Sequence, residues 1–302
     1  MGSGQEERVR IGVLVAGFCL LGGCAVPARL LLPADPQRDG TDGTDGPLGA
    51  ELIPVRATAR MTEQVPVDLV VPVDASGDLA VTDAPAVIFV HGGFVAPDRY
   101  LWLAAHQASR GYVVALPRAE LLLAITQPGN GEVALAALRD EAGPGGAIEG
   151  AVAEDGPVVV SGHSLGGVVA AMQWVGDPSI RGLALYASYP SKGTDVASAA
   201  GRPVIALAGS ADGSAPAAAV GAHLDRFAPP LYFGVVDGLD HYGWTDDPSP
   251  SELKGDGQPG RPVPELRRDV DRVLDTWLDA WLREDGAAAA RLDQPFPNVE
   301  NP

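Results

Sequence analysis

Cysteine is nearly absent from this 302-residue chain. Its two cysteines, Cys19 and Cys24, both lie near the start of the sequence, so the rest of the chain can form neither a disulfide framework nor a cysteine-based metal site. Aromatic residues contribute only 6%, which predicts a core of small aliphatic side chains. Hydrophobic residues reach 46%, so the chain can fold as one large domain, although two are possible, without metals or disulfides.

Positive charge is also scarce. The chain carries 21 lysines and arginines against 39 acidic residues, a net charge of -18. Nucleic-acid phosphates and anionic lipid surfaces would be repelled, so we expect no nucleic-acid partner and no simple adsorption to such membranes. The acidic surface favours solubility and says little about an uncharged ligand. We expect no metal and no cofactor.

The N-terminal apolar run is short. Residues 11–23, with the sequence IGVLVAGFCLLGG, follow Arg8 and Arg10. An ordinary membrane-spanning helix needs about 20 apolar residues, so this length instead suits the apolar region of a secretory signal.

The run ends in LGG followed by Cys24 and resembles a bacterial lipobox. The resemblance implies that residues 1–23 are a lipoprotein-type signal peptide and that Cys24 is the lipidated mature N-terminus. The protein would then be an extracytoplasmic lipoprotein of the bacterial cell envelope, touching the membrane only through its lipid. Glu6 and Glu7 offset the arginines, which departs from the usual pattern, and a plain signal of a secreted protein or an uncleaved anchor is the alternative.

The segments on either side of the expected folded domain, residues 50–285, are poor in apolar residues. Residues 24–49 include the stretch PADPQRDGTDGTDGPLG and are expected to form a flexible linker. Its repeated aspartates lack the spacing and final glutamate of an EF-hand, which favours a solvated linker over a calcium site. Residues 286–302 are rich in alanine and proline, and we expect a disordered tail.

Between these segments, strand-like and helix-like stretches alternate. Continuous apolar runs are typical of strands buried on both faces. We expect strands near 52–60, 66–73, 86–90, 112–116, 158–160, 182–187, 203–208 and 231–236, and helices near 97–110, 132–142, 165–175, 215–227 and 264–283. This order predicts an α/β fold with a mostly parallel central sheet and helices on both faces. In such sheets the functional residues follow the carboxyl ends of the strands.

Ser164 lies at one such strand end. A run of three valines leads into Gly162-His163-Ser164-Leu165-Gly166, and a helix is expected to follow at once. This is the strand-turn-helix context of a nucleophile elbow, in which flanking glycines allow close approach of strand and helix. We therefore predict that Ser164 is a nucleophile.

A carboxylate and an imidazole follow two later strands. Asp212 comes after the 203–208 strand, where a plain turn aspartate is the alternative interpretation. His241 is the one histidine of five in a loop after the last strand; His91 and His163 belong to glycine-rich motifs, and His106 and His223 fall in helices. We predict that His241 takes the Ser164 proton and that Asp212 orients it.

Several segments together resemble the α/β-hydrolase superfamily over roughly residues 60–283. They are HGGFVAPDRYLWLAAHQASRGYVVALP, GHSLGGVVAAM, LALYASYP, AGSADGSAP and DHYGW. Ser164, Asp212 and His241 also occur in the triad order of that family. More closely, the chain is similar to the branch without a large cap that includes dienelactone hydrolases, chlorophyllases and cutinase-like esterases, although dienelactone hydrolases carry cysteine where this chain has Ser164.

The resemblance implies an oxyanion hole at the turn His91-Gly92-Gly93-Phe94. One backbone N–H would come from Phe94, or alternatively Gly93, and the other from Leu165. It also implies hydrolysis of small-molecule or lipid-like carboxylic esters without a cofactor. A peptidase or amidase with the same triad, or a hydrolase-fold binding protein without activity, is the alternative. Leu121, Leu122, Leu123 and Ile125 line an acyl pocket or simply belong to the core. The oligomeric state does not follow from the sequence.

Overall fold

The structure, a computed structural model, describes residues 29–32, 46–58, 64–119, 122–123 and 129–302. The expected signal peptide and Cys24 lie outside these residues, as do Leu121 and Ile125. Within the described part, no helix is both long enough and apolar enough to cross a membrane.

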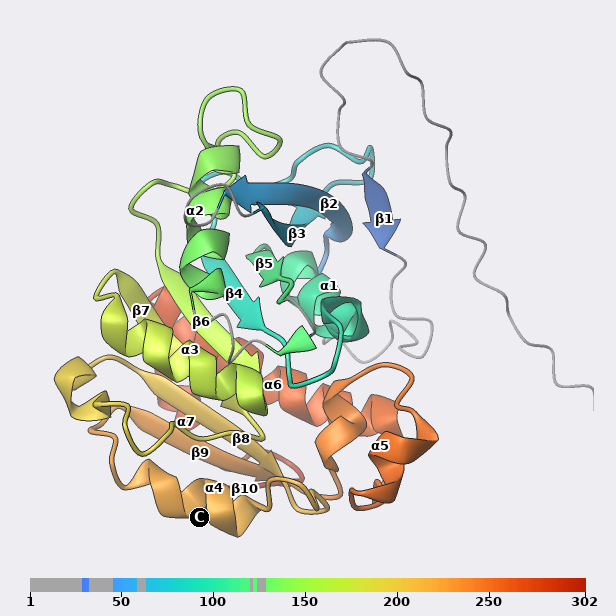
Figure 1. Cartoon of the computed structure of the whole chain (residues 1–302). Coiled ribbons are helices and arrows are strands. Elements are labelled where there is room, and N and C mark those ends of the chain that lie inside the picture. Colours follow the sequence, from blue (N-terminus) through green and yellow to red (C-terminus); the bar gives the residue numbers. More distant parts are fainter. Residues whose placement is uncertain (1–28, 33–45, 59–63, 120–121, 124–128) are drawn as a thin grey trace, which may run out of the picture.

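In the part of the chain that the structure describes, the strands form one ten-stranded sheet in the order β1-β2-β3-β5-β4-β6-β7-β8-β9-β10 (Figure 1). The strands are β1 (Leu30–Leu32), β2 (Gly49–Thr58), β3 (Gln64–Val73), β4 (Ala86–Val90), β5 (Val113–Pro117), β6 (Val158–His163), β7 (Ile180–Tyr186), β8 (Val204–Gly209), β9 (Leu231–Val236) and β10 (Val299–Glu300). Strands β4 to β9 are parallel, whereas β1, β2, β3 and β10 pair antiparallel with their neighbours. The predicted α/β class with a mostly parallel sheet is confirmed.

Helices cover both faces of this sheet. They are η2 (Pro97–Tyr100), α1 (Leu101–Ser109), α2 (Asn130–Ala142), α3 (Leu165–Gly176), η5 (Val196–Ala199), α4 (Ala217–Leu224), η6 (His241–Trp244), α5 (Pro250–Lys254), α6 (Val263–Leu282) and α7 (Gly286–Leu292). Helices α2, α3 and α4 pack into the core on one face, and α1 and α6 pack on the other (Figure 1). The central strands are buried on both faces because their side chains are valine, alanine, leucine and isoleucine.

The C-terminal residues 286–302 are ordered, so the prediction of a disordered tail is wrong. The Asp285 side chain accepts hydrogen bonds from the Ala287 and Ala288 backbone N–H groups and begins α7. Strand β10 then pairs antiparallel with β9, and Phe296 is buried against Tyr232, with ring centroids 6.2 Å apart. One aromatic anchor and one paired strand hold a segment whose composition alone suggested disorder.

The expected linker also contains a paired segment. Leu30–Leu32, within residues 24–49, form β1 by pairing with Ala50 to Leu52 of β2. The reason is the free edge of β2, which offers unpaired backbone groups to any extended neighbour. Composition does not reveal such an edge, because it exists only after the sheet has formed.

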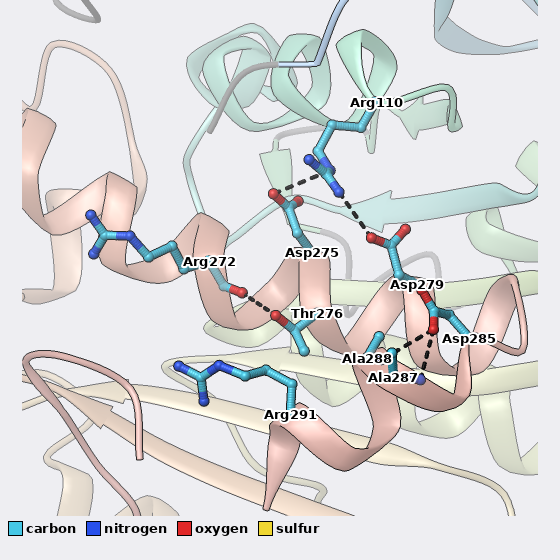
Figure 2. Close-up of a pocket in the computed structure, with 9 residues that line it drawn as sticks. All are labelled: Arg110, Arg272, Asp275, Thr276, Asp279, Asp285, Ala287, Ala288 and Arg291. Carbon is cyan, nitrogen blue, oxygen red and sulfur yellow. Dashed lines mark hydrogen bonds and ion pairs between the residues drawn. The ribbon is translucent and has the colours of Figure 1, made fainter. Parts of the chain in front are cut away.

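A hollow of about 360 Å³ lies between the end of α1 and helices α6 and α7 (Figure 2). Arg110, directly after α1, forms ion pairs with Asp275 at 3.2 Å and with Asp279 at 2.9 Å, both on α6. These ion pairs join α1 to α6 next to α7, and none of the residues that line the hollow is a predicted site residue.

Candidate active site

The four predicted site segments follow the carboxyl ends of parallel strands. The HGG turn follows β4, Ser164 follows β6, Asp212 follows β8 and His241 follows β9. Strands β4 and β6 are neighbours, as are β8 and β9. The same edge of the sheet therefore presents all four segments.

Ser164 occupies the sharp turn between β6 and α3. Its backbone angles, φ 52° and ψ -124°, lie in a region that residues with side chains rarely adopt. Three hydrogen bonds hold the strained peptide: its N–H donates to the Tyr186 carbonyl at 2.9 Å, and its carbonyl accepts from the Gly167 N–H at 3.0 Å and the Ser188 hydroxyl at 2.6 Å. The side chain of Ser164 is thereby carried outward, and the residue is partly exposed.

Close packing explains the two glycines beside the turn. A Cβ on Gly162 would lie 2.4 Å from the Gly166 carbonyl carbon, and a Cβ on Gly166 would lie 2.2 Å from the Val90 carbonyl oxygen. Both separations are far below van der Waals contact. The glycines therefore let α3 start directly against β4 and β6, as the motif predicted.

Ser164, His241 and Asp212 are hydrogen-bonded in series. His241 Nε2 lies 3.0 Å from Ser164 Oγ, and His241 Nδ1 lies 2.9 Å from Asp212 Oδ2. The other carboxylate oxygen, Oδ1, accepts the backbone N–H groups of Ser214 at 2.8 Å and Ala215 at 2.5 Å. With Asp212 as acceptor, Nδ1 carries the imidazole proton and Nε2 presents its lone pair to the Ser164 hydroxyl.

The three side chains differ in their access to water. The Asp212 side chain is fully buried and that of His241 is 5% exposed, whereas Ser164 is partly open. Burial strengthens the interaction of the carboxylate with a charged imidazole, because little water screens it. A substrate can therefore reach Ser164 from solvent, while the Asp212–His241 hydrogen bond behind it is shielded from water.

The other histidines have separate partners. His106 is bonded to Asp275 on α6, at 3.0 Å, and His223 stacks on Tyr189 in the part of the molecule around α4. The ring of His91 accepts the Ala119 N–H at 3.1 Å through Nε2, and burial lowers its pKa. Among the five, His241 is the one in hydrogen-bond contact with Ser164.

His163 and Tyr100 form a contact that sequence reasoning missed. The Tyr100 hydroxyl accepts the Gly92 N–H at 3.0 Å and donates to His163 Nδ1 at 2.9 Å. Burial lowers the pKa of His163 well below its usual range, and the neighbouring His241 ring, 4.6 Å away between centroids, acts in the same direction. His163 is therefore neutral and fixes the HGG turn to the nucleophile turn. The sequence did not single out Tyr100, because it lies on η2, outside both glycine-rich turns.

The predicted oxyanion donors lie close together but are not equivalent. The Phe94 N–H donates to the Leu122 carbonyl at 2.7 Å, so this group is already engaged. Gly93 lies directly against Leu165, since a Cβ on it would be 2.7 Å from Leu165 Cδ1. Leu165 is the first residue of α3, where helix N–H groups have no partner within the helix. The backbone N–H groups of Gly93 and Leu165 are the better-suited pair.

No group of three or more metal-ligating side chains is found in the described ranges. A comparison with curated proteins finds no significant match. Residues 86–265, from the start of β4 into α6, match the model of the alpha/beta hydrolase family. The matched segment spans more than half of the chain and includes Ser164, Asp212 and His241. The chain therefore belongs to the alpha/beta hydrolase family.

Proposed function

We propose that the protein is a serine hydrolase that cleaves carboxylic esters through an acyl-Ser164 intermediate. The observation that carries the proposal is the series of two hydrogen bonds from Asp212 through His241 to Ser164, at 2.9 and 3.0 Å. Membership of a hydrolase family and the strained backbone of Ser164 support it. A binding protein without activity would have no use for this arrangement.

In the first step, Ser164 Oγ attacks the acyl carbon while His241 Nε2 takes its proton. The carbon becomes tetrahedral, and its former carbonyl oxygen carries the negative charge. We assign the N–H groups of Gly93 and Leu165 to this oxyanion; each such donor is worth roughly 3–4 kcal/mol. The buried Asp212 carboxylate stabilises the imidazolium formed at the same time.

The second step breaks the ester bond. His241 returns its proton to the leaving alkoxide, which departs as an alcohol, and the acyl group stays on Ser164. Water then enters, loses a proton to His241 Nε2 and attacks the acyl carbon. Collapse of this second tetrahedral species releases the carboxylic acid, and the proton goes back to Ser164 Oγ. The reaction consumes one water molecule, restores Ser164 and His241 to their starting states and needs no cofactor.

Apolar side chains beside Ser164 favour a substrate with an apolar acyl group. Phe94 is 70% exposed and Leu165 is 37% exposed, although both are large hydrophobic residues. Each belongs to a segment that flanks the nucleophile. Contact with an acyl chain would remove this surface from water, at about 25 cal/mol per Å².

Labelling with a fluorophosphonate tests the proposed nucleophile. We expect the probe to attach to the wild-type protein and not to Ser164→Ala, because the probe reacts with an activated serine hydroxyl. Mass spectrometry of the labelled peptide identifies the site. Ser198→Ala, which removes a hydroxyl on η5 that donates to the Asp195 carbonyl at 2.7 Å, is the matched control and should still be labelled. Folded wild-type protein that stays unlabelled would contradict the proposal.

The bond type needs a separate comparison. A panel of p-nitrophenyl esters of increasing acyl length, run beside the matching p-nitroanilides, distinguishes an esterase from an amidase. We expect turnover of the esters and little of the anilides. A higher kcat/KM for the anilides would replace the ester assignment with the amidase one and leave the role of Ser164 intact.

We also propose that Cys24 is the lipidated N-terminus of an extracytoplasmic form of this protein. The support is the sequence before it, an apolar run after two arginines that ends in LGG. Intact mass of protein extracted from bacterial membranes should show a chain that begins at Cys24 and carries lipid. Cys24→Ser should abolish the modification, whereas Cys19→Ser, inside the removed segment, should not. A soluble product that retains Met1 would refute this proposal.

A further inference from the structure

A short segment, residues 256–261, lies across the two loops that carry Asp212 and His241. It follows α5 and has the sequence DGQPGR. Four of its residues contact the backbone of the His241 loop or of the Asp212 loop. We call it the strap. The two loops also bond to each other directly: the Ala211 N–H donates to the Leu239 carbonyl at 3.0 Å, and the Gly238 N–H donates to the Ser210 hydroxyl at 2.7 Å.

Asp256 joins the two loops with one carboxylate. Its Oδ1 accepts the Gly213 N–H at 2.8 Å, directly after Asp212, and also the N–H of Gly257 at 2.7 Å. Its Oδ2 accepts the Tyr242 N–H at 3.0 Å, directly after His241. The residues next to the acid and next to the base are therefore bonded to the two oxygens of the same side chain.

Backbone packing keeps the strap against both loops. A Cβ on Gly257 would lie 1.7 Å from the Ala211 carbonyl oxygen, so the strap touches the acid loop with no room for a side chain. At its other end, the Gly260 N–H donates to the Gly238 carbonyl at 2.8 Å. The Arg261 guanidinium donates to the Asp237 carbonyl at 2.7 Å, which holds the start of the base loop.

The strap is anchored on the side of the oxyanion turn as well. Glu252 of α5 forms an ion pair with Arg99 of η2 at 2.7 Å, and hydrogen bonding to Arg99 helps to lower the pKa of Glu252. Arg99 also donates to the carbonyl of Asp246 at 2.7 Å. The element before the strap is therefore fixed to the helix that follows the HGG turn.

We infer that Asp256 is a positioning residue that, in addition to the direct bonds between the two loops, fixes the residues next to Asp212 and His241 relative to each other. This inference rests on the proposed function. During each reaction His241 gains and loses a proton, and its hydrogen bond to Asp212 must keep its geometry through the change. A carboxylate that accepts from both loops couples their positions, because a shift of either loop breaks a bond to charged oxygen. Misplacement of a catalytic group by about 1 Å can cost on the order of 10²-fold in rate.

Asp256→Ala tests the inference, with Asp74→Ala as the matched control. Asp74 is also a turn carboxylate whose Oδ1 accepts two backbone N–H groups, from Ser76 at 2.8 Å and Asp78 at 3.1 Å, and it follows β3. We expect Asp256→Ala to lower kcat on p-nitrophenyl esters by on the order of 10²-fold, with little change in KM. Asp74→Ala should leave both values unchanged.

A second measurement reads the geometry without activity. Proton NMR of the downfield Nδ1–H of His241 reports its hydrogen bond to Asp212. This signal should shift upfield or broaden in Asp256→Ala and stay in place in Asp74→Ala. If Asp256→Ala fails to fold, Asp256→Asn replaces it. The amide oxygen still accepts the Gly213 N–H, whereas the amide NH₂ faces the Tyr242 N–H and cannot accept it. We therefore expect a smaller decrease in kcat, about tenfold.

The two proposals can fail separately. If wild-type protein neither hydrolyses esters nor reacts with the fluorophosphonate, the proposed function fails, while the NMR signal still tests the strap. If a folded Asp256 variant keeps the wild-type kcat and the wild-type His241 signal, the positioning role is overturned.

Discussion

His241→Ala is expected to lower kcat by about 10⁴- to 10⁶-fold while the protein stays folded. Without the imidazole, nothing takes the Ser164 proton during attack, and nothing protonates the leaving alkoxide. The Asp212 carboxylate would then face an empty space in a buried position, so some loss of stability is expected too. Steady-state kinetics on a p-nitrophenyl ester, together with thermal unfolding, separate the two effects.

His223→Ala is the matched control for this prediction. His223 lies on α4, is partly buried and bonds through Nδ1 to the Ala219 carbonyl at 2.9 Å, so its loss should leave kcat unchanged. An unchanged rate in His241→Ala would mean that another group acts as the base. His163, with its ring 4.6 Å from that of His241, would be the first residue to examine.

Gly166→Ala is expected to lower the stability of the protein severely. The added Cβ would lie 2.2 Å from the Val90 carbonyl oxygen and 2.4 Å from that of His91. Both are backbone atoms of the β4 edge and cannot rotate away, so α3 must move. We expect a loss of more than about 4 kcal/mol in the free energy of unfolding, the range reached by severe single substitutions. Chemical denaturation with a spectroscopic readout measures it.

Gly176→Ala provides the comparison within the same helix. Gly176 ends α3, and a Cβ there would meet nothing within 4 Å. The substitution should be neutral or stabilise the protein by up to about 1 kcal/mol, because alanine restricts the unfolded chain. Equal stability of the two variants would show that α3 does not pack against β4 as closely as the structure has it.

Local features were the predictable part of this molecule. The apolar runs at 86–90 and 231–236 became β4 and β9 with the expected bounds, because strands buried on both faces need apolar residues at every position. The nucleophile turn was equally readable, since strand, glycines and helix are contiguous in the chain. The place of His241 directly after the 231–236 strand could be predicted for the same reason, because position along an α/β chain predicts position at the sheet edge.

Features that depend on distant partners were not predictable in this way. The composition of residues 286–302 predicts disorder, because it does not reveal that β10 pairs with the edge of β9 and that Phe296 packs against Tyr232. The HGG turn favours Phe94 as an oxyanion donor, because no sequence pattern shows that its N–H donates to the Leu122 carbonyl. Tyr100 and Asp256 carried no motif, since each acts by joining two segments that are far apart in sequence.

The sequence by itself was enough to predict the candidate catalytic side chains, starting with Ser164. The α/β order sends each loop to one edge of the sheet, and the glycines of the nucleophile turn require no distant information. Only the tertiary structure decided the contacts: Ser164 and His241 are 77 residues apart in the chain, and His241 and Asp212 are 29 apart. Hydrogen bonds need alignment within a few tenths of an ångström, and that precision comes from packing and from residues such as Tyr100 and Asp256.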